Sequence, residues 1–109
     1  MGNQGGDVVV SLNMLPTDSG GRRGPTPAWH FNCLMTIDEL NFDVRLRLEN
    51  VGSISPGQKT IVPISFLNLK LAKKHCSVGK RFSLREAKVI GDGVIEEILF
   101  SDESAMHQG

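Results

Sequence analysis

The histidines and cysteines of this sequence, residue types that often bind metal ions or take part in nucleophilic catalysis, are His30, Cys33, His75, Cys76 and His107. Only His75 and Cys76 are adjacent, and the C-x-x-C and H-x-H spacings of metal sites do not occur. A nucleophile pair of Cys76 and His30 would need an orienting carboxylate, and no spacing singles one out. We therefore expect no metal site, no cofactor and no enzymatic activity.

The sequence also lacks the loop with which P-loop proteins hold nucleotide phosphates. That loop has the pattern G-x-x-x-x-G-K-[ST], in which backbone amides and a lysine surround the phosphates. The pair Gly79-Lys80 stands here without the first glycine and without the final Ser or Thr. We therefore expect that the protein neither binds nor hydrolyses GTP.

Length and composition indicate one small globular domain. The 109 residues are 39% hydrophobic, and 12 basic residues balance 12 acidic ones. We interpret residues 1–109 as a single domain with an ordered core at about 7–100. No apolar run approaches the roughly 18–20 residues of a membrane span, the first residues lack signal-peptide features, and two distant cysteines suggest no disulfide framework. These features predict a cytoplasmic protein that does not bind membranes.

Alternating apolar and polar residues predict a protein built from strands. The cleanest pattern places Phe42, Val44, Leu46 and Leu48 on one face, and a later strand adds Phe82 and Leu84 to the predicted core. Six predicted strands and no convincing helix indicate an all-β fold, a closed or nearly closed antiparallel barrel. The predicted strands are Asp7–Leu15, Ala28–Ile37, Asn41–Asn50, Lys59–Ala72, Arg81–Ala87 and Val89–Leu99.

Three local signals refine this barrel. The apolar residues of Lys59–Ala72 change parity near Phe66 and Leu67, which predicts a bulge; a helix at residues 67–76 is the alternative. Residues 55–58, Ser-Pro-Gly-Gln, predict a tight turn. Gly91 and Gly93 flank Asp92, which predicts a bulge or a close approach of another strand.

Four motifs, taken in order, resemble the third domain of elongation factor Tu. Residues 81–86, Arg-Phe-Ser-Leu-Arg-Glu, are similar to the family's Arg-Phe-x-Ile/Leu-Arg-Glu strand, and the strand around Gly91 and Gly93 is similar to its Val-Gly-x-Gly-Val-Val strand. Residues 20–23, Gly-Gly-Arg-Arg, stand where the family has Gly-Gly-Arg-His, and residues 55–57 resemble its Met-Pro-Gly turn. The resemblance covers roughly residues 8–99 and implies a six-stranded antiparallel Greek-key barrel.

The resemblance also implies binding residues. In that family the barrel helps to hold aminoacylated transfer RNA, packs on the GTPase domain and contacts the nucleotide-exchange factor. The positions that touch the RNA backbone there correspond to Arg22, Arg23, Arg85 and Glu86. The glycine that follows Arg-Glu in the family is Ala87 here, and its methyl group would meet a closely approaching sugar–phosphate backbone.

Further binding residues are suggested by chemistry alone. Trp29 follows the arginine-containing loop, and such a side chain stacks on nucleobases or anchors protein interfaces; its alternative role is to plug the barrel. Lys73, Lys74 and Lys80 belong to a basic stretch at residues 70–88, which is either a partner-binding surface or a solvated face.

Together these features predict a non-catalytic binding module with a translation-related role, which contacts a protein partner or a structured, transfer-RNA-like RNA. The zero net charge and Ala87 favour the protein partner. Two alternatives stay open. One is an excised transfer-RNA-clamping domain of a longer translational GTPase, and the other is a small enzyme that uses the barrel as its scaffold.

Overall fold

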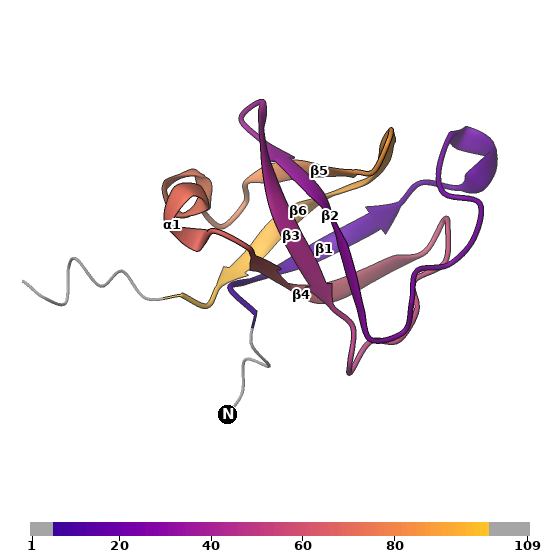
Figure 1. Cartoon of the computed structure of the whole chain (residues 1–109), viewed down its shortest axis with the longest axis horizontal. Helices are drawn as coiled ribbons and strands as arrows, with labels where there is room; N and C mark the ends of the chain where they lie inside the picture. Colours follow the sequence, from indigo (N-terminus) through magenta and orange to yellow (C-terminus); the bar gives the residue numbers. More distant parts are fainter. Residues whose placement is uncertain (1–5, 101–109) are drawn as a thin grey trace, which may run out of the picture.

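Six strands and one short helix make up the part of the chain that the computed structural model describes, residues 6–100 (Figure 1). The helix α1 spans Leu69–Ala72, and two 3-10 turns, η1 at Thr17–Ser19 and η2 at Lys73–His75, lie in the connections. The strands are β1 Val8–Met14, β2 His30–Ile37, β3 Leu40–Arg47, β4 Lys59–Phe66, β5 Arg81–Arg85 and β6 Val89–Ile98.

The strands form a closed barrel in the order β1-β4-β3-β2-β5-β6, and all neighbours are antiparallel. Strand β1 closes it by pairing with β4 on one side and β6 on the other. The consecutive strands β2, β3 and β4 are neighbours, and β1 lies beside β4, which is the Greek-key arrangement. The predicted six-stranded antiparallel barrel is therefore confirmed.

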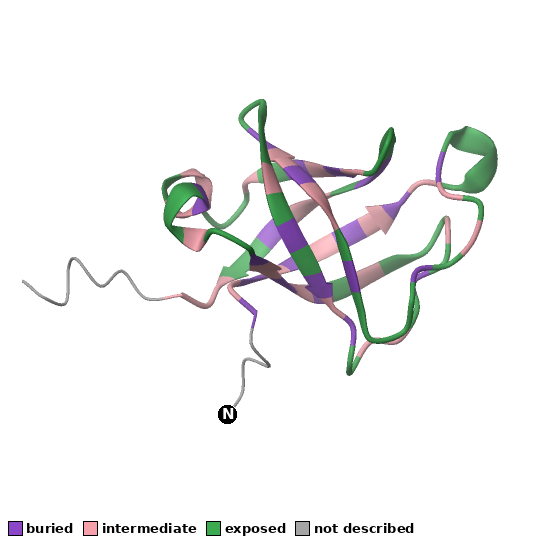
Figure 2. Cartoon of the chain, viewed as in Figure 1, coloured by how far each residue is buried: buried purple, intermediate pink, exposed green. Residues whose placement is uncertain are grey.

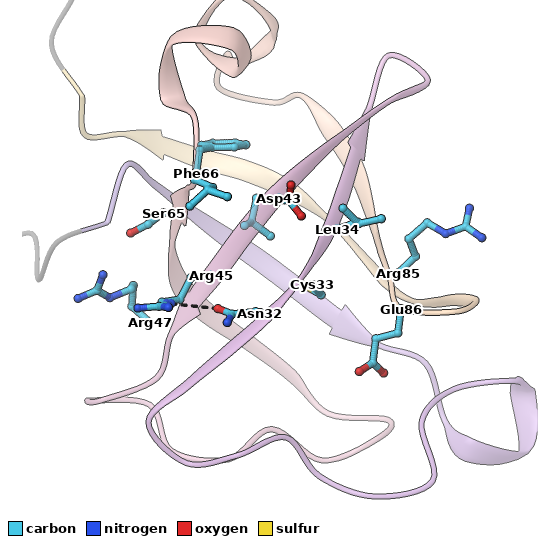
Figure 3. Close-up of a pocket in the computed structure, with 12 residues that line it drawn as sticks. Asn32, Cys33, Leu34, Asp43, Arg45, Arg47, Ser65, Phe66, Arg85 and Glu86 are labelled. Atoms are coloured by element: carbon cyan, nitrogen blue, oxygen red, sulfur yellow. Dashed lines mark hydrogen bonds between the residues drawn. The ribbon is translucent and has the colours of Figure 1, made fainter.

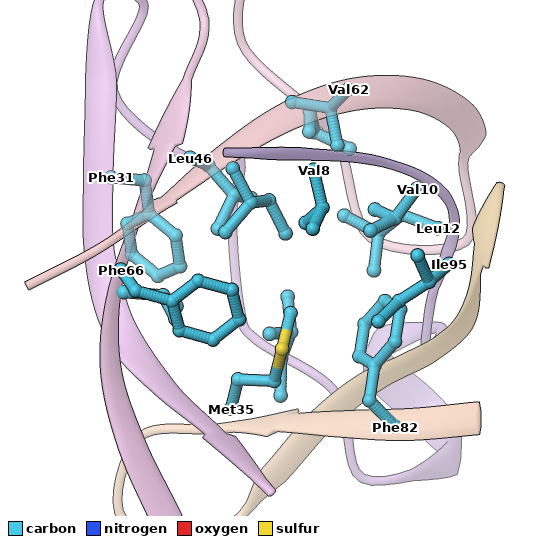
Figure 4. Packing of buried hydrophobic residues seen from close by; sticks show 14 of the residues in the cluster. Val8, Val10, Leu12, Phe31, Met35, Leu46, Val62, Phe66, Phe82 and Ile95 are labelled. Atoms are coloured by element: carbon cyan, nitrogen blue, oxygen red, sulfur yellow. The ribbon is translucent and has the colours of Figure 1, made fainter. Parts of the chain in front are cut away.

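Buried apolar side chains alternate along the strands and fill the barrel (Figures 2 and 4). In β1, for example, Val8, Val10, Leu12 and Met14 are all buried. The predicted core residues Val44, Leu46, Leu48, Phe82 and Leu84 are buried as well. The sixth, Phe42, is half-buried and sets its ring edge-on against Phe66, with 6.1 Å between the ring centroids.

The predicted close approach at Gly91 and Gly93 is confirmed. Gly93 pairs with Leu12 of β1 and with Phe82 of β5. A Cβ atom there would lie 2.7 Å from the ring Cζ of Phe82 and against the carbonyl of Ser11. At Gly91 it would lie 2.9 Å from the carbonyl oxygen of Asn13. Strand β6 therefore reaches its pairing distance from β1 only because both residues lack side chains.

The turn predicted at residues 55–58 is also present. The Gln58 N–H donates to the carbonyl of Ser55 at 3.0 Å. Gly57 has φ +85°, a conformation that favours glycine, at the second corner of the turn. The turn leads directly into β4.

The prediction of one strand over Lys59–Ala72, with a bulge near Phe66, is wrong. Strand β4 ends at Phe66, and α1 and η2 follow, as in the alternative helix at residues 67–76. Leu69, Ala72 and Cys76 pack on the core at spacings of three and four residues, the period of a helix. Strand β3 is also shorter than predicted, because the N–H groups of Val51 and Gly52 bond to the Leu48 carbonyl and turn the chain.

The first testable prediction concerns the core. Leu46 is fully buried, so Leu46→Ala should lower the free energy of unfolding by about 2–5 kcal/mol through lost burial and a cavity. Leu71 is 61% exposed, so the matched change Leu71→Ala should alter it by no more than about 0.5 kcal/mol. Urea unfolding followed by circular dichroism measures both; equal midpoints for the two variants would contradict the assignment of Leu46 to the core.

Candidate functional site

A groove of about 610 Å³ lies across the outer side of β2 and β3 and the adjoining ends of β4 and β5 (Figure 3). This volume lies in the range of ligand-binding clefts. The groove is lined by polar and apolar side chains from all four strands, which include Asn32, Leu34, Asp43, Arg45, Arg47, Ser65, Leu67, Arg85 and Glu86.

The groove lies where the barrel is weakly paired. Strands β2 and β3 pair at eight positions, from His30–Arg47 to Ile37–Leu40. On either side of this hairpin the pairing is short, with three positions between β3 and β4 and three between β2 and β5. The inward-facing residues Cys33, Val44 and Phe66 therefore also contribute to the groove lining. The short pairings thus leave a hollow on a sheet that is otherwise continuous.

Two arginines of β3 dominate one end of the groove. The Arg45 Nε–H donates to the side-chain oxygen of Asn32 at 3.0 Å, which orients its guanidinium. An Arg47 terminal nitrogen lies 3.6 Å from Glu49, a half-exposed ion pair. The Nε atom of Arg47 is buried and has no hydrogen-bond partner among the described residues. A buried donor without a partner destabilises the protein by about 1–3 kcal/mol, so Arg47 is held in an unfavourable environment.

The residues that the resemblance indicated meet at the other end. Arg22 forms an ion pair with Glu86 at 3.4 Å, places its guanidinium 4.8 Å from the centre of the Phe31 ring, and donates to the carbonyls of Gly24 and Pro25. Arg22 therefore fastens its own loop to the β5–β6 turn. Arg85 and Glu86 line the groove, whereas Arg23 is exposed and does not. The structure thus brings Arg22, Glu86 and Arg85 together.

The remaining predicted binding residues do not join this group. Trp29 is 69% exposed and precedes β2, so its alternative role as a barrel plug is wrong. Lys80 pairs with Asp38 at 2.7 Å, Lys73 lies 5.5 Å from the centre of the Phe100 ring, and Lys74 is exposed. Helix α1, next to Lys73, is well separated from the β5–β6 turn in Figure 1. The basic stretch is therefore divided between two places on the barrel.

The β2 and β3 residues of the groove were not anticipated. The alternation in Asn41–Asn50 predicts one face in the core, which is confirmed, but by itself it assigns no role to the opposite face. The sequence feature that could have indicated the groove is the pair Arg45 and Arg47. Two cations at i and i+2 must project on the same side of a strand. Their proximity to Arg85 depends on β2 lying between β3 and β5.

The thiols of Cys33, which lines the groove, and of Cys76, which does not, are poor nucleophiles. Burial, with a smaller contribution from Glu86, raises the pKa of Cys33 to about 12. Burial, with a smaller contribution from Asp7, raises the pKa of Cys76 to about 11. Both thiols are therefore protonated at neutral pH, and the thiolate is the reactive form. Among residues 6–100, no three or more His, Cys, Asp or Glu side chains lie together as a metal site requires.

A tight turn at Asp38 and Glu39 holds the far end of the β2–β3 hairpin. Both residues have positive φ, 53° and 68°, as in the two-residue turns that match strand twist. This conformation is unfavourable for residues other than glycine. The Asp38 carboxylate accepts hydrogen bonds from Lys80 at 2.7 Å and His75 at 3.1 Å. These contacts, that from Lys80 above all, lower the pKa of Asp38 and tie the hairpin to the connection between β4 and β5.

The described chain thus belongs to the class of closed six-stranded antiparallel barrels and carries an arginine-lined groove. No helix in residues 6–100 combines the length and the hydropathy of a membrane-crossing segment. A scan against protein-family models finds no match, and a search of curated proteins finds no similar sequence.

The second testable prediction follows from the lowered pKa of Asp38. A carboxyl whose pKa is lower in the folded protein stabilises it above the unfolded pKa, about 3.9, and loses this effect as the pH falls through the folded value. Wild type should therefore be more stable than Asp38→Asn at pH 6, and the difference should disappear in more acidic solution. Urea midpoints across a pH series measure it, with Glu39→Gln at the same turn as the control. A difference that does not change with pH would contradict the role of the Asp38 charge.

Proposed function

We propose that this chain is a non-catalytic binding module that holds a protein partner in the arginine-lined groove. The observation that carries this proposal is the groove itself, which is lined by Arg45, Arg47 and Arg85 together with the apolar side chains of Leu34 and Leu67. Arginine is enriched among the residues that contribute most to binding in protein interfaces. The resemblance to the third domain of elongation factor Tu supports a translation-related role.

The chemistry of the described residues supports a binding role over a catalytic one. The groove thiol of Cys33 has a raised pKa, so it is not poised as a nucleophile. The Asp38–His75 pair has no Ser or Cys within its hydrogen bonds, which join it to Lys80 instead. Among residues 6–100, these groups therefore give no support to the alternative of a small enzyme on a barrel scaffold.

Charge supports a protein partner over RNA. Asp43 and Glu86 bring two carboxylates into the groove lining, where they would repel a phosphate backbone. The guanidinium of Arg22 is already engaged with Glu86 and with the Phe31 ring. Ala87 is exposed at the β5–β6 turn and carries its methyl group where the similar family has glycine.

The alternative of a transfer-RNA-clamping domain from a longer translational GTPase depends on the same resemblance. It would use Arg22, Arg23 and Arg85 on phosphates, so binding would not depend on base sequence. Each neutralised phosphate contributes a slope of about −0.7 to −0.9 to the logarithm of affinity against the logarithm of salt. Three arginines would thus give about −2 to −3, which means weak binding at physiological salt.

The third testable prediction concerns the partner. We expect immobilised wild-type protein to retain a protein from cell lysate, and Arg45→Glu to lose most of it, because the substitution reverses a charge inside the groove. Arg81→Glu is the matched control, since Arg81 is exposed on β5 and lines a different hollow. Retention should survive ribonuclease. Loss after ribonuclease would instead support the RNA-clamping alternative, and equal loss in both variants would exclude the groove as the site.

The fourth testable prediction concerns nucleotide. Calorimetric titration of the protein with GTP and Mg²⁺ should give no binding heat, because the sequence lacks the G-x-x-x-x-G-K-[ST] motif whose backbone amides hold the phosphates. A GTP-binding translation factor measured in parallel shows that the titration works. A micromolar dissociation constant for this protein would contradict the prediction.

A further inference from the structure

We infer that the groove binds an acidic segment of the partner, in which carboxylate side chains alternate with apolar ones, and this inference rests on the proposed function. Three arginines and two exposed or half-exposed apolar side chains, Leu34 and Leu67, line one continuous hollow. Arg45 and Arg47 lie on one side of Leu34 and Arg85 on the other (Figure 3). A segment that crosses the groove would therefore meet cation, apolar side chain and cation in turn.

The guanidinium of Arg45 is held in an orientation that suits a carboxylate. Its Nε–H donates to Asn32, which fixes the plane of the guanidinium. Asn32 and Ser65 pair with Arg45 from the strands on either side, so the row Asn32–Arg45–Ser65 runs straight across β2, β3 and β4. A planar guanidinium in a fixed orientation matches the two oxygens of a carboxylate, and less entropy is lost on binding than for a mobile lysine.

Arg47 gives an independent indication of a ligand. Its Nε atom is buried without a hydrogen-bond partner among the described residues, and its contact with Glu49 is long, at 3.6 Å. A carboxylate placed in the groove offers acceptor oxygens toward which this guanidinium can turn. Binding would then satisfy a donor that the free protein leaves unsatisfied.

Two carboxylates of the groove lining, Asp43 and Glu86, limit its net positive charge. Three arginines against the two carboxylates Asp43 and Glu86 leave the lining with a single positive charge, 3 − 2 = +1. A carboxylate carries one negative charge and neutralises the lining, whereas a phosphorylated side chain carries nearly two and would leave it with an excess of negative charge. The charge of the lining therefore matches a single carboxylate.

Closure of the barrel decides how the segment is held. Each strand pairs with a neighbour on both sides over at least part of its length, so a peptide has no complete edge strand to extend. Recognition therefore depends on side chains, and removing one guanidinium should have a large effect. A lost hydrogen bond to a charged group weakens binding by about tenfold or more.

The test is fluorescence anisotropy with a labelled peptide pool of alternating glutamate and Leu, Val or Phe. Binding should weaken about tenfold or more in Arg45→Ala, Arg47→Ala and Arg85→Ala, and should stay unchanged in Arg81→Ala. The same pool with glutamine for glutamate should not bind. Nuclear magnetic resonance should show the Arg47 Nε–H signal move when the glutamate pool is added.

Several outcomes would overturn the inference: no binding of the glutamate pool at millimolar concentration, equal binding of the glutamine pool, an equal effect of Arg81→Ala, or tighter binding of an RNA hairpin. Failure here is distinguishable from failure of the proposed function. If Arg45→Glu still abolishes capture of the lysate protein while the glutamate pool does not bind, the groove binds a protein of different chemistry and only the acidic segment is wrong.

Discussion

The strand pairing and the outer surface of this molecule depend on the closure of a six-stranded sheet around one small core. Strand β1 pairs with β4 and β6 at once, and β6 approaches it closely because Gly91 and Gly93 leave room for the backbone of β1 and for the Phe82 ring. Closure leaves no strand without a neighbour on either side, which limits edge-to-edge association. A partner bound as we propose would therefore meet mainly side chains of the outer surface.

The strands of the barrel are not paired over equal lengths, and the groove lies where the pairing is short. The β2–β3 hairpin is paired along its whole length but is joined to β4 and β5 over only three positions each. A hairpin held so loosely at its sides needs support at its tip. The Asp38 carboxylate supplies it by bonding to Lys80 and His75 across the barrel end. The contacts of Asp38 with Lys80 and His75, and the groove, thus both follow from one long hairpin in a small barrel.

The sequence predicted what depends on local alternation and missed what depends on neighbours distant in the chain. The core positions Val44, Leu46 and Leu84 follow from the two-residue period, and the turn at Gly57 follows from its residue types. The parity change after Phe66 is equally consistent with a bulge and a helix, so Lys59–Ala72 was assigned to a strand where α1 forms. The groove joins Asn32, Arg45 and Arg85, and only the strand order makes them neighbours.

The distribution of charge explains how a chain with no net charge can still present a cationic site. Arg22 and Arg85 were predicted to act alike, yet their environments separate them. Arg22 is fastened to Glu86 and to the Phe31 ring, where it holds a loop in place. Figure 3 shows the side chain of Arg85 pointing away from Glu86. One arginine thus holds a loop in place, and the other contributes its charge to the groove lining.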